Sequence, residues 1–166
     1  MKRLLIVRHA KSSWDNPDLE DFFRPLNNRG FRDSPNMADY IKNKGLEIQL
    51  FISSPAVRAL STAQIFASKI GYSIDKIQQE MSFYEFLDEG EIILSKIREI
   101  DNNLDTVAIF GHNDTFLYLI QSLSNGKIDT FPTCAVANVV FNVKNWSEVS
   151  SKKCKVDFFV TPKSIK

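Results

Sequence analysis

The chain has 166 residues, which suits one domain spanning residues 1–166 with a sizeable buried core. Its 21 basic and 20 acidic side chains give a net charge of +1, which argues against a protein that binds nucleic acid or a membrane surface. The apolar run at residues 4–7 is too short for a signal peptide, and no run approaches the roughly 18 residues of a membrane helix. Cys134 and Cys154 form no CxxC pair, which argues against zinc. These features favour a cytoplasmic protein.

The first third of the chain alternates strand, loop and helix patterns. Residues 3–7 are apolar and partly β-branched, which predicts a buried strand. Residues 10–29 are polar and contain two prolines, which predicts a long loop of the kind that is usually functional. Residues 30–44 have helical spacing of apolar side chains, and residues 50–52 form a second short apolar strand.

A second helix is predicted directly after that strand. Ser54 is expected as its N-cap, Pro55 as its first residue and Gly71 as its end. The rest of the chain continues the alternation of amphipathic helices and apolar strands. We expect helices over residues 89–100 and 115–124, and strands over residues 106–110, 137–143 and 156–160.

This order of elements predicts an α/β fold. The strands are too apolar to have a face in water, which indicates a sheet covered on both sides by helices. We therefore expect a three-layer α/β/α sandwich with a mostly parallel central sheet, in which the last two strands include an antiparallel edge. No internal repeat, low-complexity tract or linker divides the chain, which favours one domain.

The only two histidines both follow an apolar strand. His9 comes after residues 4–8, and His112 comes after residues 107–111. Ligands bind beyond the carboxyl ends of the strands in open parallel sheets, so the topology brings both imidazoles to the same edge. A single histidine in such a place is more often structural, but two in equivalent places favour a shared site.

Arginines are placed near the same edge. Arg8 precedes His9, and Arg58 lies in the first turn of the helix expected after Ser54, where free N–H groups attract anions. Arg24 and Arg29 lie in the long loop, from which they either reach this site or remain surface charges. A planar guanidinium matches the oxygens of a phosphate group.

Histidines and arginines together favour phosphoryl transfer. Nearby cations should lower the pKa of His9 and keep a lone pair available for attack on phosphorus, while His112 is expected as a protonated partner of a phosphoryl oxygen. Arginines can neutralise the transferred charge, so we expect no cofactor and no metal. The chain has no GxxxxGK[ST] and no GxGxxG motif, which argues against a nucleotide cradle.

Three segments resemble the motifs of a known family, the histidine phosphatase superfamily, which contains phosphoglycerate mutases, acid phosphatases and phosphohistidine phosphatases. Leu5-Ile6-Val7-Arg8-His9-Ala10 resembles its Arg-His motif, residues 53–63 resemble the motif with the second arginine, and Gly111-His112-Asn113 resembles the third. Their order agrees from residue 4 to about residue 143. Residues 8–14 and 23–30 look most like the short SixA-type branch.

The resemblance implies a phosphoglycerate mutase-like fold and a role for each matching residue. His9 corresponds to the nucleophile, and Arg8, Arg58 and His112 correspond to the residues that hold the phosphate. Family members that act on phosphoesters usually add an acid that protonates the leaving oxygen, and Glu85 is the candidate here, with Glu80 behind it. Either carboxylate is equally well explained as a surface charge.

Asn113, which follows the second histidine, either shapes the backbone there or caps the next helix. Capping is the favoured interpretation.

Several functions remain open at this stage. The leading hypothesis is a SixA-like phosphatase that removes phosphate from phosphohistidine in proteins; the second is a phosphatase of small phosphomonoesters, for which Glu85 should be needed. The third is a phosphate-binding adaptor without turnover, and the fourth is a packing role for both histidines. The expected partner is a phosphorylated protein or small molecule, with no nucleic acid or membrane. The oligomeric state stays open, with a monomer as the working expectation.

Overall fold

Six strands form a single sheet in the order β3-β2-β4-β1-β5-β6 in the computed structural model, which describes residues 1–85 and 90–166. The four strands from β3 to β1 are parallel, and β5 is antiparallel to both of its neighbours. The strands are β1 (Lys2–Arg8), β2 (Leu50–Ser53), β3 (Gln78–Gln79), β4 (Thr106–Gly111), β5 (Val136–Phe141) and β6 (Cys154–Val160).

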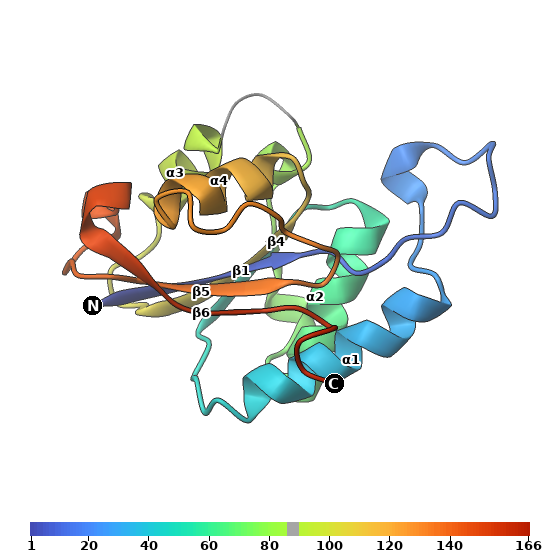
Figure 1. The fold of residues 1–166 in the computed structure, drawn as a ribbon, viewed down its shortest axis with the longest axis horizontal. Helices are drawn as coiled ribbons and strands as arrows, with labels where there is room; N and C mark the ends of the chain where they lie inside the picture. Colours follow the sequence, from blue (N-terminus) through green and yellow to red (C-terminus); the bar gives the residue numbers. More distant parts are fainter. Residues whose placement is uncertain (86–89) are drawn as a thin grey trace.

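Helices cover both faces of this sheet, which confirms the predicted α/β/α sandwich (Figure 1). Helices α1 and α2 pack on one face, and α3 and α4 pack on the other. The helices are α1 (Asn28–Lys42), α2 (Val57–Ile70), α3 (Glu91–Ile97) and α4 (Thr115–Leu123). None of the helices in the described residues is long and apolar enough to cross a bilayer.

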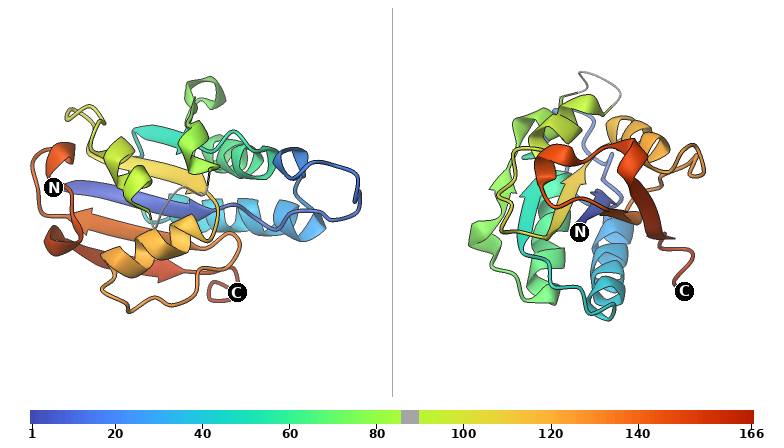
Figure 2. Two further views of the ribbon diagram at one scale, coloured as in Figure 1. Left: turned by 90° about the horizontal axis from the view of Figure 1, so that it is seen from above. Right: turned by 90° about the vertical axis from the view of Figure 1, so that its left-hand side faces the viewer.

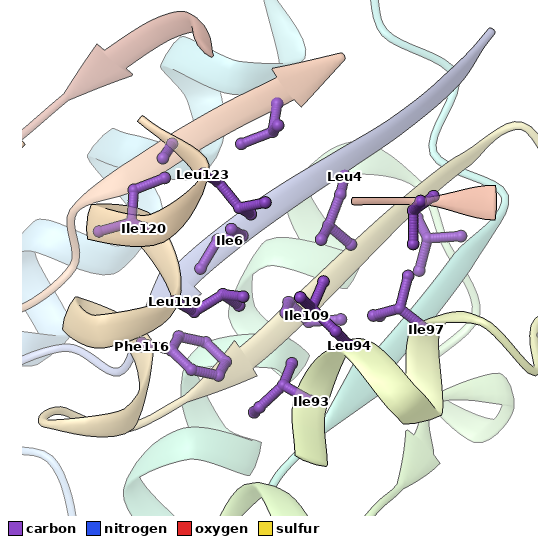
Figure 3. Close-up of a cluster of buried hydrophobic side chains, with 14 of the residues drawn as sticks. Leu4, Ile6, Ile93, Leu94, Ile97, Ile109, Phe116, Leu119, Ile120 and Leu123 are labelled. Atoms are coloured by element: carbon purple, nitrogen blue, oxygen red, sulfur yellow. The ribbon is translucent and has the colours of Figure 1, made fainter. Parts of the chain in front are cut away.

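Side chains of the central strands contact the two helical layers in turn, because successive side chains of a strand point to opposite faces of the sheet. In β1, Leu4 and Ile6 join the cluster under α3 and α4, whereas Leu5 and Val7 join the cluster over α1 and α2. Figure 3 shows the first cluster, in which side chains of α3 and α4 lie over β1 and β4. Burial on both faces explains why these strands read as continuous apolar runs.

Some boundaries differ from the expected ones. Helix α2 begins at Val57 with Ala56 as its N-cap, so the prediction of Ser54 as the cap was wrong. Helix α3 ends at Ile97 rather than residue 100, and its expected start at residue 89 lies outside the described residues.

The last two strands form the expected antiparallel edge of the sheet, because β6 is the outermost strand and pairs antiparallel with β5, which is also antiparallel to β1. The two-residue strand β3 was not expected, because two glutamines carry no apolar pattern. The predicted long loop after β1 extends beyond the carboxyl end of that strand (Figure 2) and contains one turn of 3-10 helix, Asp21–Phe23.

Candidate active site

The register of β1 and β4 brings the two histidines together. Arg8 pairs with Gly111 at the end of the parallel ladder, so the next residue of each strand is a histidine. The backbone N–H of His9 donates to the carbonyl of Gly111 at 3.0 Å. The ring centroids of His9 and His112 lie 5.1 Å apart.

Hydrogen bonding and burial define the state of His9. Its Nδ1 lies 2.7 Å from the carbonyl oxygen of Ala10, which can only accept, so Nδ1 carries the proton and Nε2 keeps a lone pair. Burial lowers the pKa of His9 from 6.5 to about 3, and Arg58 and Arg8 act in the same direction. The imidazole is therefore neutral at physiological pH, as expected, although burial is a larger cause than the arginines.

His112 is also neutral, which corrects the expectation of a protonated partner. Burial, with smaller contributions from His9 and Arg58, lowers the pKa of His112 to about 2. Its Nε2 lies 2.8 Å from the hydroxyl oxygen of Ser54, and the N–H of Ala56 donates to the same oxygen. Ser54 thus orients an imidazole instead of capping α2.

Two guanidinium groups converge on one carboxylate beside the histidines. Arg58, in the first turn of α2, donates to the backbone carbonyl of Asp21 at 2.7 Å and to its Oδ2 at 2.9 Å. Arg24 donates to Oδ1 of Asp21 at 3.1 Å and to Ser12 Oγ at 2.6 Å. Although partial burial acts to raise it, these bonds and one from Tyr84 hold the pKa of Asp21 at about 2. Asp21 is therefore ionised.

The guanidinium of Arg8 is the third at this pocket, and it does not contact Asp21. Its Nη1 donates to the carbonyl of Phe131 at 3.0 Å, and its buried Nε has no hydrogen-bond partner within the described part of the chain. A buried charged donor of this kind is costly unless an acceptor binds it. Asn113 donates to the same Phe131 carbonyl at 2.8 Å and α4 has Asp114 at its N-cap, so the prediction that Asn113 caps the helix was wrong.

These side chains line an open pocket of about 360 Å³. Its other residues include Trp14, whose exposed ring stacks on Arg24 with the guanidinium carbon 3.3 Å from the ring centroid. The lining residues are Arg8, His9, Lys11, Ser12, Trp14, Asp21, Arg24, Arg58, His112, Asn113 and Thr133. A neutral imidazole with a free lone pair beside three arginines is suited to bind and attack a phosphoryl group.

Residues 4–91, more than half of the chain, match the sequence profile of the histidine phosphatase superfamily (branch 1). The chain belongs to this superfamily. The match contains Arg8, His9 and Arg58, and it ends before His112. As a histidine phosphatase, the chain is a hydrolase that acts on phosphorylated substrates.

This histidine phosphatase is similar in sequence to one curated relative and in fold to several solved structures. A chloroplast protein of unknown function from Arabidopsis thaliana is 29% identical over 155 residues, covering 89% of this chain and 70% of the relative. The protein histidine phosphatase SixA, in complex with tungstate, superposes with a TM-score of 0.80 at 22% identity, covering 99% of both chains. A protein from Agrobacterium tumefaciens that is assigned as a SixA phosphohistidine phosphatase superposes with a TM-score of 0.79 at 24% identity, covering 97% of this chain and 98% of that one.

Three predicted site residues do not line the pocket of this histidine phosphatase. Arg29 lies in the first turn of α1 and pairs with Asp33 at 3.4 Å, one helical turn away on the same surface. Glu85 is exposed. Glu80 accepts from Ser82 at 2.8 Å and faces a different hollow on the β3 side of the sheet.

Other residues of the site were not predicted. Asp21 and Ser12 reach it only through the path of the 10–29 segment, for which the sequence has no periodic signal. Trp14 lies in the first SixA-like motif, but nothing in the sequence indicated that it stacks on Arg24. Among the described residues, no group of three or more His, Cys, Asp or Glu side chains is arranged to hold a metal ion.

Proposed function

We propose that this histidine phosphatase removes phosphate from phosphohistidine side chains of proteins, with His9 as the nucleophile. The observation that carries the proposal is the hydrogen bond from His9 Nδ1 to the Ala10 carbonyl, which leaves Nε2 as the basic nitrogen beside three arginines. The likeness of the fold to SixA structures supports the choice of substrate.

The three arginines and His112 each have a defined task in this proposal. Arg8, Arg24 and Arg58 bind the phosphoryl oxygens and neutralise the charge that spreads over them during transfer. The Ser54 hydroxyl donates to Nε2 of His112, so the neutral ring carries its proton on Nδ1 and donates it to a phosphoryl oxygen. Because the guanidiniums surround the reacting phosphorus, their charges act most strongly in the transition state.

The reaction takes two balanced steps. Nε2 of His9 forms a bond to phosphorus while the P–N bond of the substrate breaks, and the leaving imidazole takes the electron pair. A substrate ring protonated at its other nitrogen leaves as neutral imidazole and needs no acid from the enzyme. Water then attacks phosphorus, the P–Nε2 bond breaks, and inorganic phosphate is released. Asp21 is ionised and so cannot supply a proton to a leaving group.

The test is phosphate release from a phosphohistidine-bearing protein, with EDTA present, by the wild type and the His9→Ala variant. We expect release by the wild type, no release by His9→Ala at an unchanged melting temperature, and wild-type release by Asp18→Asn, a change at an exposed acid of the same segment. A radiolabelled substrate should leave an acid-labile label on the wild-type chain and none on His9→Ala. Release by a folded His9→Ala would refute the nucleophile.

A parallel assay with p-nitrophenyl phosphate and the Glu85→Gln variant separates the two substrate classes. The proposal predicts a higher kcat/KM for the phosphohistidine substrate and no effect of Glu85→Gln on it. A preference for the ester, together with a loss of ester activity in Glu85→Gln, would favour a phosphomonoesterase. Phosphate binding without turnover of either substrate would favour an adaptor.

A further inference from the structure

Asp21 is the one acidic side chain among the described residues that line the pocket. It lies in the single 3-10 turn of the long segment between β1 and α1, three residues before Arg24. Its side chain is 48% exposed, so it is reachable by water and yet makes three hydrogen bonds. A carboxylate in a pocket built for an anion requires a physical explanation.

The contacts of Asp21 join two separate parts of the fold. Arg58 comes from α2, and its guanidinium makes a two-pronged contact with the Asp21 backbone and carboxylate. Arg24 comes from the same segment as Asp21 and binds the other carboxylate oxygen. The carboxylate therefore bridges a guanidinium fixed on a helix and one carried by a loop.

Electrostatics explains why a bridge is needed there. Arg8, Arg24 and Arg58 all line a pocket of about 360 Å³, and like charges at this separation repel one another. Arg24 and Arg58 are each nearly buried, with 6% and 5% of their surface exposed, so water screens them little. An ionised carboxylate between them offsets the repulsion and keeps both guanidiniums at the pocket in the absence of substrate.

The hydrogen-bond count leaves capacity for a ligand. A guanidinium has five N–H donors. Arg58 uses two of them on Asp21, and Arg24 uses three, on Ser13, Asp21 and Ser12. Asp21 thus occupies part of each guanidinium and leaves other N–H groups for phosphoryl oxygens.

Tyr84 supports the carboxylate from a third direction. Its hydroxyl donates to Asp21 Oδ2 at 2.9 Å, and its ring packs edge-on against Phe22, with centroids 5.1 Å apart. The turn that carries Asp21 is thus held by contacts from α2 and from the segment that follows β3. Such support indicates a fixed element of the site.

We propose that Asp21 is a positioning residue, whose carboxylate fixes the guanidiniums of Arg58 and Arg24 in the geometry that binds a phosphate group. This inference rests on the proposed function only in taking phosphate as the ligand. It differs from an autoinhibitory role, in which the carboxylate would occupy the place of the phosphate and compete with it. The two roles predict opposite effects of removing the charge.

The first test measures binding of inorganic phosphate by calorimetry to the wild type and to Asp21→Asn, with Asp18→Asn as the matched control for the change in net charge. Positioning predicts that the Kd for phosphate rises roughly tenfold in Asp21→Asn, equivalent to the loss of one charge-assisted contact, and stays at the wild-type value in Asp18→Asn. Unchanged or tighter binding by Asp21→Asn would overturn the inference, and tighter binding would indicate competition.

The second test separates positioning from a purely structural role. A variant that is partly unfolded loses kcat while its KM for p-nitrophenyl phosphate is unchanged, whereas misplaced arginines raise KM. We expect most of the loss in Asp21→Asn to appear in KM, and partial recovery in Asp21→Glu, which keeps the charge. If Asp21→Asn is too unstable to assay, the increase in melting temperature with phosphate is compared between Asp21→Ala, which also removes the charge, and the wild type, and an equal increase would overturn the inference.

The two proposals fail in distinguishable ways. A wild type whose phosphate affinity depends on the Asp21 carboxylate, but which releases no phosphate from any substrate, would refute the phosphatase function and leave the positioning role intact. A wild type that turns over substrate, with Asp21→Asn equal to it in Kd and KM, would refute the positioning role alone.

Discussion

Nδ1 of His9 lies 2.7 Å from the carbonyl oxygen of Ala10, the residue that follows it in the chain. The peptide of Ala10 is held in turn by Thr62, whose Oγ1 accepts from the Ala10 N–H at 3.0 Å and donates to the Arg58 carbonyl at 2.7 Å. The tautomer of the proposed nucleophile and the backbone of Arg58, a proposed phosphate ligand, are therefore joined through the buried hydroxyl of Thr62. This link connects the end of β1 to the first turn of α2.

Thr62→Val tests that link, because valine has the same shape and no hydroxyl. The Ala10 N–H would lose its partner in the interior, at a cost of about 1–3 kcal/mol in the free energy of unfolding. We also expect kcat/KM to fall roughly tenfold, because a displaced Ala10 carbonyl no longer fixes Nδ1–H of His9. Urea unfolding and steady-state kinetics measure the two effects. Thr62→Ser, which keeps the hydroxyl, should retain most activity, and equal activities of the two variants would contradict the link.

The neutral state of His9 predicts the acid limb of the pH profile. Burial places the pKa of His9 at about 3, so Nε2 stays unprotonated far below the usual 6.5 of histidine. After correction for the ionisation of the substrate, kcat/KM should therefore not fall between about pH 7 and about pH 5. The profile is measured with two substrates of different phosphate pKa. An acid limb near 6.5 that is common to both would contradict the prediction.

Unlike kcat/KM, which should stay constant, the free energy of unfolding should decrease as pH falls. His9 and His112 are the only histidines, and burial lowers their pKa values in the folded state to about 3 and about 2. Between pH 6.5 and these values the unfolded chain binds more protons, so the free energy of unfolding decreases as pH falls through this window. At about pH 5 the loss is at most about 2 kcal/mol for each imidazole.

Urea unfolding at about pH 7.5 and about pH 5 checks this effect. The matched variant is His112→Gln, which removes one of the two imidazoles. It should lose less stability between the two pH values than the wild type does. An equal loss in both proteins would show that carboxylates, and not the histidines, control acid sensitivity.

The sequence predicted the architecture well because the central strands are apolar on both faces and each ends in a chemically distinctive residue. The neighbouring positions of His9 and His112 follow from the parallel pairing of Arg8 with Gly111, which topology alone made expected. Helix boundaries were less predictable: Ser54 is a residue type that favours N-caps, yet its hydroxyl contacts His112. Because His112 lies 58 residues from Ser54, no local sequence pattern predicts their contact.

The 10–29 segment marks the limit of such prediction. The sequence left both Arg24 and Arg29 as either site residues or surface charges; Arg24 lines the pocket, whereas Arg29 pairs along α1. The spacing of Arg29 and Asp33, four residues apart in a predicted helix, could have revealed that pairing. For Asp21, a comparable spacing exists only toward Arg24, three residues along the chain. Its other partners come from α2 and from Tyr84, and only the folded path of the segment joins them to Asp21.

The packing of this segment against α1 depends on Gly30. A Cβ added there would collide with the backbone carbonyl oxygen of Lys11 and lie 3.2 Å from the Cβ of Leu26. The same carbonyl accepts from the N–H of Asn27 at 3.0 Å, and Asn27 caps α1 through its side chain. The two ends of the segment that carries Arg24 therefore meet at Gly30, where only glycine fits.

Gly30→Ala should therefore lower both stability and activity. We expect a loss of about 1–3 kcal/mol from the forced shift of backbone, and a raised KM because Arg24 and Asp21 move away from α2 with the segment. The matched control is Gly45→Ala, where φ is +70° and no atom lies within 4 Å, so backbone strain costs about 1–2 kcal/mol far from the pocket. Thermal unfolding and the KM for p-nitrophenyl phosphate are measured for both variants. A KM that changes equally in the two would mean that lost stability, rather than displacement of the segment, accounts for the effect.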